Sequence, residues 1–327
     1  MNPQWRRGWE ARKYGGWRNK GTRLADFGMV EYCQLVKREG QEDKKDVVNF
    51  ELLEEILNMK KILYVSDLDG TLLRSNQTTS EYTNKIINNL TDRGILFSYA
   101  TSRSIHTAKI VTKGLDAKIP VITYNGVCIV DNQTFEILDA NFLDGNIYLL
   151  LNELFSEGIY PTVYAMVDGK ERFSNLPRKS SKGTLDFIES RNDIRKRIVD
   201  TEEELMAGEI FYITCIESSE KLKPFYDKYK DKYHCVFQKD MYSGEQWLEI
   251  MPKDSTKASA VKRLKKLLGC NYVVAFGDGI NDIEMFELAD EAYAMENAVH
   301  ELKSIATGVI DSNNDDGVAH WLEENIL

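Results

Sequence analysis

Short apolar runs alternate with longer amphipathic stretches over most of the chain, from residue 59 onward. The run at 62–65 is apolar on both faces, which is typical of a strand buried inside a parallel sheet. Similar runs at 95–99, 120–124 and 272–276 predict further strands. Because helix-length segments separate these strands, the pattern predicts a Rossmann-like, doubly wound parallel α/β sheet.

Helix start and stop signals support this order of elements. Thr79 or Ser80 can cap a helix that ends at Gly94, because hydroxyl side chains favour N-caps and glycine favours the position after a helix. The stretch 257–268 is amphipathic and is followed by Gly269. Both helices therefore have predictable ends.

The regular alternation of predicted strands and helices is interrupted between residues 144 and 249. Strands there are joined by turns, and Asp168-Gly169 is a hairpin signal. We therefore expect an α/β core formed by residues 59–143 and 250–327. Residues 144–249 are expected to form an α+β cap domain inserted into that core.

Composition narrows the class of protein. The chain has 327 residues, of which 43% are hydrophobic and 29% charged, as in globular proteins with a sizeable core. A net charge of −10 argues against broad nucleic-acid binding, and no apolar run is long enough to span a bilayer. Five scattered cysteines without a C-x-x-C spacing predict a reducing, cytoplasmic location.

The candidate chemistry begins where the first strand ends, at Asp-Leu-Asp-Gly-Thr, residues 67–71. Asp67 and Asp69 would repel each other in a shared site unless a cation neutralised them, and oxygen ligands suit Mg²⁺. Asp67 could then attack as a nucleophile while Asp69 handles the proton. The plain alternative is an Asp-x-Asp-Gly turn without catalysis.

Three further motifs follow in order. They are Ala-Thr-Ser-Arg at 100–103, Lys257 at a helix start, and Gly-Asp-Gly-Ile-Asn-Asp at 277–282. Together with residues 67–71 they resemble the haloacid dehalogenase superfamily of phosphotransferases. The long insert between the second and third motifs is similar to the Cof-like subfamily with its type IIB cap. The resemblance covers roughly residues 59–327.

The resemblance implies specific roles for the acidic residues. Asp67 would become an aspartyl-phosphate, and Asp69 would act first as acid and then as base. A Mg²⁺ ion would be held by Asp67, Asp278 and the backbone carbonyl of Asp69. Asp282 and Asn281 would complete the metal site by orienting its water or Lys257.

It also implies a phosphate-binding set. Thr101, Ser102, Asn125 and Lys257 would contact the phosphate, with Thr101 and Lys257 taking part in catalysis. Ser102 stands where the family more often has glycine, and Lys257 is followed by Ala258 rather than glycine. Neither departure removes a catalytic group.

We therefore expect a Mg²⁺-dependent phosphatase of small phosphorylated metabolites, with sugar phosphates as the first candidates. The alternatives are a phosphosugar mutase of the same fold and a non-catalytic regulator that binds a phosphorylated effector. Neither a nucleic-acid nor a membrane partner is expected. Polar and aromatic residues of the cap are candidates to contact the organic part of the substrate: Tyr164, Arg172, Tyr242 and Trp247.

Residues 1–58 do not share the pattern of the remainder. Their first 23 positions hold seven basic residues, one acid and three tryptophans, a mixture that can bind nucleic acid or anionic membranes. The segment lacks a sustained helical period and the apolar core of a secretory signal. Because Met59 begins a stretch similar to the usual start of this family, we interpret 1–58 as a poorly ordered extension or a mis-assigned start. A dedicated binding arm is the alternative.

Overall fold

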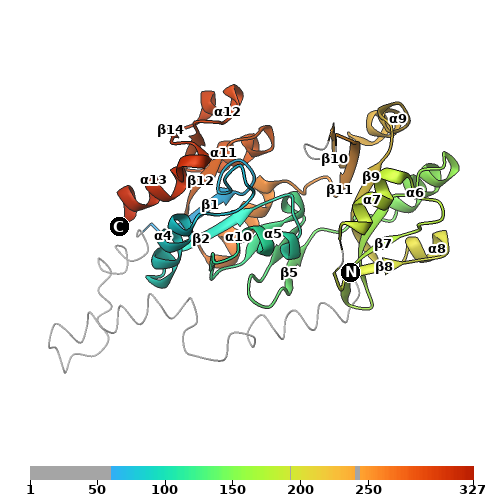
Figure 1. The fold of residues 1–327 in the computed structure, drawn as a ribbon, viewed down its shortest axis with the longest axis horizontal. Helices are drawn as coiled ribbons and strands as arrows, with labels where there is room; N and C mark the ends of the chain where they lie inside the picture. The colour runs from blue at the N-terminus through green and yellow to red at the C-terminus, as the bar shows by residue number, and fades with distance from the viewer. Residues whose placement is uncertain (1–59, 192, 240–243) are drawn as a thin grey trace, which may run out of the picture. The chain divides into compact units, whose positions relative to one another are not determined.

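The computed structural model describes residues 60–191, 193–239 and 244–327. The expectations for residues 1–58 lie outside these ranges. Within them the chain forms two β-sheets flanked by helices (Figure 1). None of the helices in this part of the chain combines the length and the apolar character that a membrane span requires.

The core sheet has the strand order β14-β13-β12-β1-β2-β3-β4-β5. Its strands are parallel from β14 to β3, and β4 and β5 are antiparallel. The strands of this sheet are β1 (Ile62–Asp67), β2 (Leu96–Ala100), β3 (Val121–Thr123), β4 (Cys128–Val130), β5 (Ile137–Ala140), β12 (Tyr272–Gly277), β13 (Glu291–Met295) and β14 (Gly308–Ile310). The predicted doubly wound α/β fold is confirmed.

Helices and short 3₁₀ turns connect these strands. The helices are α4 (Glu81–Asp92), α5 (Ile105–Val111), α10 (Lys257–Leu268), α11 (Ile283–Leu288), α12 (His300–Ile305) and α13 (Gly317–Ile326). The 3₁₀ turns are η1 (Tyr124–Gly126), η2 (Ile280–Asp282) and η3 (Asn313–Asp315). Ser80 caps α4 through its side chain, and Gly269 ends α10 in the left-handed conformation, as the sequence predicts.

The cap sheet has the strand order β10-β11-β9-β6-β7-β8. Its strands are β6 (Thr162–Val167), β7 (Lys170–Asn175), β8 (Lys196–Ile198), β9 (Glu209–Ile216), β10 (His234–Lys239) and β11 (Gln246–Met251). Its helices are α6 (Ile147–Ser156), α7 (Lys182–Glu189), α8 (Glu202–Leu205) and α9 (Ser219–Tyr229). The strand pattern in the sequence does not predict α7, β8 or α8, because elements of three to eight residues show too little periodicity.

The two faces of the cap sheet have different neighbours. Helices α6 and α9 pack against the face that carries Val163 and Ile213. Successive side chains of a strand point to opposite faces, so Tyr164 and Tyr212 lie on the other face. There they join the apolar cluster of the core sheet through Tyr124. The cap is thus packed onto the core on one face and closed by its own helices on the other.

Candidate active site

The predicted site residues meet at one edge of the core sheet. Asp67 is the last residue of β1, Thr101 follows β2, Asn125 lies in η1 after β3, and Asp278 follows β12. These four strands are neighbours in the order β12-β1-β2-β3, and all run parallel. Their carboxyl ends therefore bring together side chains from distant parts of the sequence, where open α/β sheets bind ligands.

A buried lysine lies at the centre of the site. The Nζ of Lys257 is 2.7 Å from Oδ1 of Asp67 and 2.7 Å from Oδ1 of Asp282. The Lys257 side chain is 2% exposed, and that of Asp282 is fully buried. Among the described residues, Asp67, Asp278 and Asp282 offer carboxylate oxygens that all lie within 4.8 Å of one another. Such a set of oxygen donors suits Mg²⁺.

The electrostatics of this cluster favour a cation. Burial raises the pKa of Asp67 well above its ordinary value, and Asp282 and Asp278 add to the effect while Lys257 opposes it. Burial also raises the pKa of Asp278 to about 6. Burial acts to lower the pKa of Lys257, but Asp282 and Asp67 outweigh it and raise that pKa. Three carboxylates around one ammonium leave a surplus of negative charge that a bound cation would neutralise.

Asp282 is fixed on both sides. While Oδ1 accepts from Lys257, Oδ2 accepts from the backbone N–H groups of Asp278 at 3.1 Å and Gly279 at 3.0 Å. These contacts suit a residue that orients Lys257. Asn281 is exposed, and its Oδ1 lies 2.7 Å from where a Cβ on Gly279 would stand.

The turn after β1 is shaped to approach Asp278. Thr71 donates its hydroxyl to Oδ1 of Asp278 at 2.7 Å. Gly70 has a φ of 84°, and a Cβ at this position would lie 2.3 Å from Oδ2 of Asp278. Only glycine allows this backbone conformation and this contact together.

Asp69 faces a different partner from the other acids. Arg103 donates from Nε to Oδ2 of Asp69 at 2.8 Å and from Nη2 to Oδ1 at 2.5 Å. The Asp69 side chain is 35% exposed. Its carboxylate is thus engaged by a bidentate ion pair next to the buried cluster.

The phosphate-binding candidates occupy two adjacent loops. Thr101 is fully buried, and its Oγ1 accepts from the backbone N–H of Arg103 at 3.1 Å, while Ser102 is exposed. The N–H of Asn125 donates to the carbonyl of Thr101 at 3.0 Å. The Asn125 side chain is buried, and its Oδ1 has no hydrogen-bond partner in the described part of the chain. A buried amide oxygen without a partner is expected to accept a hydrogen bond from a ligand or water, whereas a phosphate oxygen could be bound only by the NH₂ group of the same amide.

Comparison with known proteins agrees with this geometry. Residues 64–322 match the family model of the haloacid dehalogenase-like hydrolases. One curated relative, 5-amino-6-(5-phospho-D-ribitylamino)uracil phosphatase YwtE of Bacillus subtilis, is 30% identical over 281 residues, which cover 79% of this chain and 96% of the relative. This chain belongs to the haloacid dehalogenase-like hydrolase family.

Solved structures share the fold of this chain. A crystal structure from Thermotoga maritima matches with a TM-score of 0.68 at 24% identity, covering 82% of this chain and 98% of that one. A subclass IIB sugar phosphatase matches with a TM-score of 0.60 at 19% identity, covering 80% and 98%. The predicted Cof-like family, the α/β core with an inserted cap, and the enzyme class of phosphatase are confirmed.

Two residues near the site were not singled out from the sequence of this hydrolase. Arg103 pairs with Asp69, and Thr71 binds Asp278. Arg103 lies in the motif at 100–103 and Thr71 in the motif at 67–71. Their positions within these motifs are the signal in the sequence that could have identified them. By contrast Tyr164, expected among the substrate-contacting residues, is buried against Tyr124 with ring centroids 5.6 Å apart.

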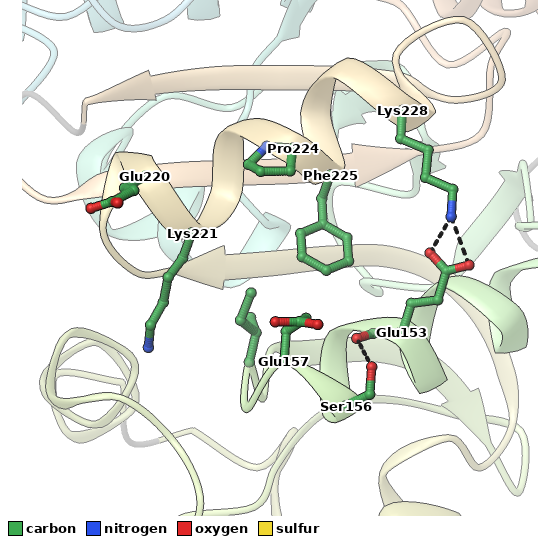
Figure 2. A pocket seen from close by; sticks show the side chains of 9 residues that line it. Glu153, Ser156, Glu157, Glu220, Lys221, Pro224, Phe225 and Lys228 are labelled. Atoms are coloured by element: carbon green, nitrogen blue, oxygen red, sulfur yellow. Dashed lines mark hydrogen bonds and ion pairs between the residues drawn. The ribbon is translucent and has the colours of Figure 1, made fainter.

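This hydrolase also has a hollow on its cap, between α6 and α9, with a volume of about 520 Å³. Figure 2 shows Phe225 and Pro224 on α9, and Glu153 paired with Lys228. The Nζ of Lys228 lies 2.8 Å from Oε1 and 2.6 Å from Oε2 of Glu153. The residues that line the hollow belong to none of the four motifs. The motif residues and the buried charge cluster therefore identify the strand-end site, rather than this hollow, as the candidate active site.

Proposed function

We propose that this hydrolase is a Mg²⁺-dependent phosphatase of small phosphorylated metabolites, with sugar phosphates as first candidates, and that Asp67 carries the phosphoryl group. The observation that carries the proposal is the buried contact of Asp67 with Lys257 beside two further carboxylates. The name of the relative YwtE, a phosphatase of a phosphoribitylamino-uracil, supports a phosphorylated small molecule as the substrate class.

The donor set fits Mg²⁺. Its members are oxygen atoms, and the surplus negative charge of the cluster would be neutralised by a divalent cation. Asp67, Asp278 and the backbone carbonyl of Asp69 would hold the ion, with Asn281 and Asp282 behind them. Bound Mg²⁺ would supply the positive charge that lets a phosphate dianion approach these carboxylates.

In the proposed first step, an oxygen of Asp67 attacks the phosphorus atom and the bond from phosphorus to the ester oxygen breaks. Asp69 must first carry a proton, which it gives to that leaving oxygen; the oxygen departs as an alcohol and Asp69 is left as a carboxylate. Because Arg103 donates to both oxygens of Asp69, one of these hydrogen bonds must be given up so that the oxygen concerned can carry the proton and donate it to the ester oxygen.

In the second step, Asp69 takes a proton from water while the water oxygen attacks the phosphorus. The bond from phosphorus to Asp67 breaks, inorganic phosphate leaves, and the carboxylate is restored. Lys257 holds Asp67 in place and stabilises the charge that builds up on the phosphoryl oxygens. Thr101, Ser102 and Asn125 bind the non-bridging oxygens of the phosphate.

The cap is proposed to select the substrate. Residues 144–249 would cover the site and exclude water during formation of the aspartyl-phosphate, while residues 59–143 and 250–327 carry the chemistry. We place this activity in the cytoplasm, because the scattered cysteines suit a reducing compartment.

The test is phosphate release from a panel of phosphorylated metabolites, with Mg²⁺ or with EDTA. Wild type is compared with Asp67→Asn and with the control Asp290→Asn, which alters an exposed acid that binds the N–H of Val273 at 2.8 Å. We expect Mg²⁺-dependent release that is lost in Asp67→Asn and kept in the control. Release that survives Asp67→Asn would contradict the proposal. No release by wild type without an activator sugar would favour a mutase or a phosphate-binding regulator.

A further inference from the structure

Tyr124 joins the core to the cap through its hydroxyl. The hydroxyl donates to Oε1 of Glu171 at 2.6 Å and accepts from Nη1 of Arg195 at 2.7 Å. Nη1 of Arg195 also donates to Oε1 of Glu171 at 2.6 Å. Tyr124 belongs to η1 of the core, whereas Glu171 lies in β7 and Arg195 directly precedes β8. The three side chains therefore form one hydrogen-bonded cluster, named here the docking cluster, across the two domains.

The docking cluster is buried and costly to separate. The Arg195 side chain is 4% exposed and that of Glu171 12%. Asp193 holds the other side of the guanidinium, at 3.0 Å from Nε and 2.7 Å from Nη2. Burial and the neighbouring Glu171 raise the pKa of Tyr124 well above its ordinary value, so the hydroxyl keeps its proton and can donate. Moving the cap away from Tyr124 would leave these charged groups with fewer partners, which is unfavourable.

The ring of Tyr124 adds an apolar contact to the same place. Its centroid lies 5.6 Å from that of Tyr164, 5.4 Å from that of Phe211 and 5.3 Å from that of Tyr212. These distances are typical of favourable aromatic pairs. The three partners belong to β6 and β9 of the cap, so ring and hydroxyl are both bound by the same domain.

The backbone at Tyr124 is in an unfavourable conformation. Tyr124 has a φ of 53° and Asn125 a φ of 52°, in the left-handed region that residues with a Cβ rarely adopt. Such conformations persist only where the surroundings hold them, and they gather at functional sites. The contacts of the Tyr124 side chain with the cap are in a position to hold this turn.

The turn η1 also touches the candidate active site on two sides. The N–H of Asn125 donates to the carbonyl of Thr101 at 3.0 Å. A Cβ on Gly126 would lie 2.1 Å from the carbonyl oxygen of Thr256, the residue before Lys257. Between these contacts lies the buried side chain of Asn125, whose amide NH₂ is the group that could donate to a phosphate oxygen. A shift of the turn would therefore move Asn125 relative to Thr101 and Lys257.

We propose that Tyr124 is a positioning residue through which the docked cap holds the turn η1, and with it the amide of Asn125, in place for phosphate binding. The inference rests on the proposed function, because it takes the ligand of Asn125 to be phosphate. The cap would then do more than cover the phosphate site, because it would also hold η1 in place through its contacts with Tyr124.

The test uses Tyr124→Phe, which removes the hydroxyl and keeps the ring. We measure kcat and KM for p-nitrophenyl phosphate with Mg²⁺ in wild type, Tyr124→Phe, Asn125→Ala and the double variant. Tyr124→Phe should lower kcat/KM about tenfold, because small displacements of positioned groups are costly. If Tyr124 acts through Asn125, kcat/KM of the double variant should be less than about twofold below that of Asn125→Ala alone. Glu171→Gln, which changes the same cluster from the cap side, should show the same non-additivity.

The matched control is Tyr160→Phe. The hydroxyl of Tyr160 donates to Glu202 at 3.0 Å and accepts from Lys179 at 3.2 Å, a similar trio that lies within the cap alone. This variant should leave kcat/KM unchanged.

Three outcomes would overturn the inference, and they differ in whether they also overturn the proposed function. Two of them would overturn the inference alone, provided that wild-type turnover depends on Asp67. In the first, kcat/KM of Tyr124→Phe equals that of wild type. In the second, the losses in kcat/KM of the two single variants multiply fully in the double variant. A wild type that neither releases phosphate from any probe nor binds inorganic phosphate in calorimetry would overturn the proposed function and the inference together.

Discussion

Two buried cations in this hydrolase are each held by two carboxylates, yet their surroundings differ. Lys257 lies at the strand ends of the core sheet, and Arg195 lies where the cap meets the core. Both side chains are less than 5% exposed. The comparison shows how the charge cluster of the candidate active site differs from the one between cap and core.

The difference lies in the carboxylates. Near Lys257, removal from water raises the pKa of Asp278 to about 6, and the neighbouring carboxylate of Asp282 adds to the rise. Beside Arg195, burial opposes ionisation of Asp193, but hydrogen bonds from the guanidinium outweigh it and lower the pKa. The first cluster still needs positive charge, whereas the second already holds its acid ionised. A raised carboxylate pKa at the strand ends thus supports a cation-binding site.

The largest expected effect follows from removing the lysine. Lys257→Met should lower kcat by at least about a hundredfold, because a preorganised charge on the phosphoryl oxygens is lost. The control is Lys265→Met on the same helix, which removes only a partly exposed pair with Asp290 at 3.3 Å and should leave kcat unchanged. Steady-state phosphate release measures both. If kcat of Lys257→Met stays near the wild-type value, the Lys257 cluster is not needed for catalysis and does not differ from the Arg195 cluster in that respect.

Removing the arginine should act on stability first. Arg195→Met should lower the free energy of unfolding by about 3–5 kcal/mol, because it leaves buried carboxylates without their partner. Urea denaturation measures the change. The control Arg178→Met removes an exposed contact with Asp200 at 3.8 Å and should not shift the urea midpoint. Equal midpoints for the two variants would mean that the docking cluster does not stabilise the fold.

The pH dependence of Mg²⁺ binding should sharpen the comparison further. Without metal, Asp278 has a pKa of about 6 in the folded chain against an ordinary 3.8, so the folded state holds this proton more tightly. The contribution of this proton to the free energy of unfolding is fully present below the pKa that Asp278 has in the unfolded chain. It is lost as the pH rises through about 6. Mg²⁺ would replace the proton, so the Mg²⁺-induced rise in Tm should be larger at about pH 8 than at about pH 5. Thermal unfolding with Mg²⁺ and with EDTA checks this, and an equal rise at both pH values would argue against Asp278 as a ligand.

The smallest effect is expected at Ser102. Its side chain is exposed, and replacing it by the glycine that the family more often has should change KM by less than about threefold, since surface substitutions stay near 0.5 kcal/mol. Initial rates over a range of substrate concentrations measure it. A tenfold change would mean that the hydroxyl contacts the phosphate.

Local signals made much of the core predictable. Helix α10 has the bounds that its sequence predicts, and the strand β12 begins at residue 272, where the apolar run begins. The motif residues Asp67, Thr101 and Asp278 were predictable neighbours because parallel strand ends meet at one sheet edge. Arg103 contacts Asp69 across 34 positions, but both stand in recognised motifs.

The docking cluster had no such signal. Tyr124 lies 47 positions from Glu171 and 71 from Arg195, and neither partner is part of a motif or a periodic pattern. Arg195 precedes a three-residue strand that the sequence pattern does not predict. Tyr164 was predicted to contact the substrate, because aromatic residues are common both in binding sites and in domain interfaces and the sequence does not distinguish the two. Contacts of this kind depend on how the cap sheet packs, which no local pattern encodes.

The most direct test of the central claim is to find the phosphoryl group on Asp67. The Asp69→Asn variant is mixed with p-nitrophenyl phosphate and Mg²⁺, quenched in acid and examined by peptide mass spectrometry. The nitrophenolate leaves without a proton, so the first step proceeds while hydrolysis is slowed, and the peptide that contains Asp67 should gain one phosphoryl group. Wild-type turnover without a phosphorylated Asp67 in this variant, or with the group on another residue, would contradict the proposed mechanism.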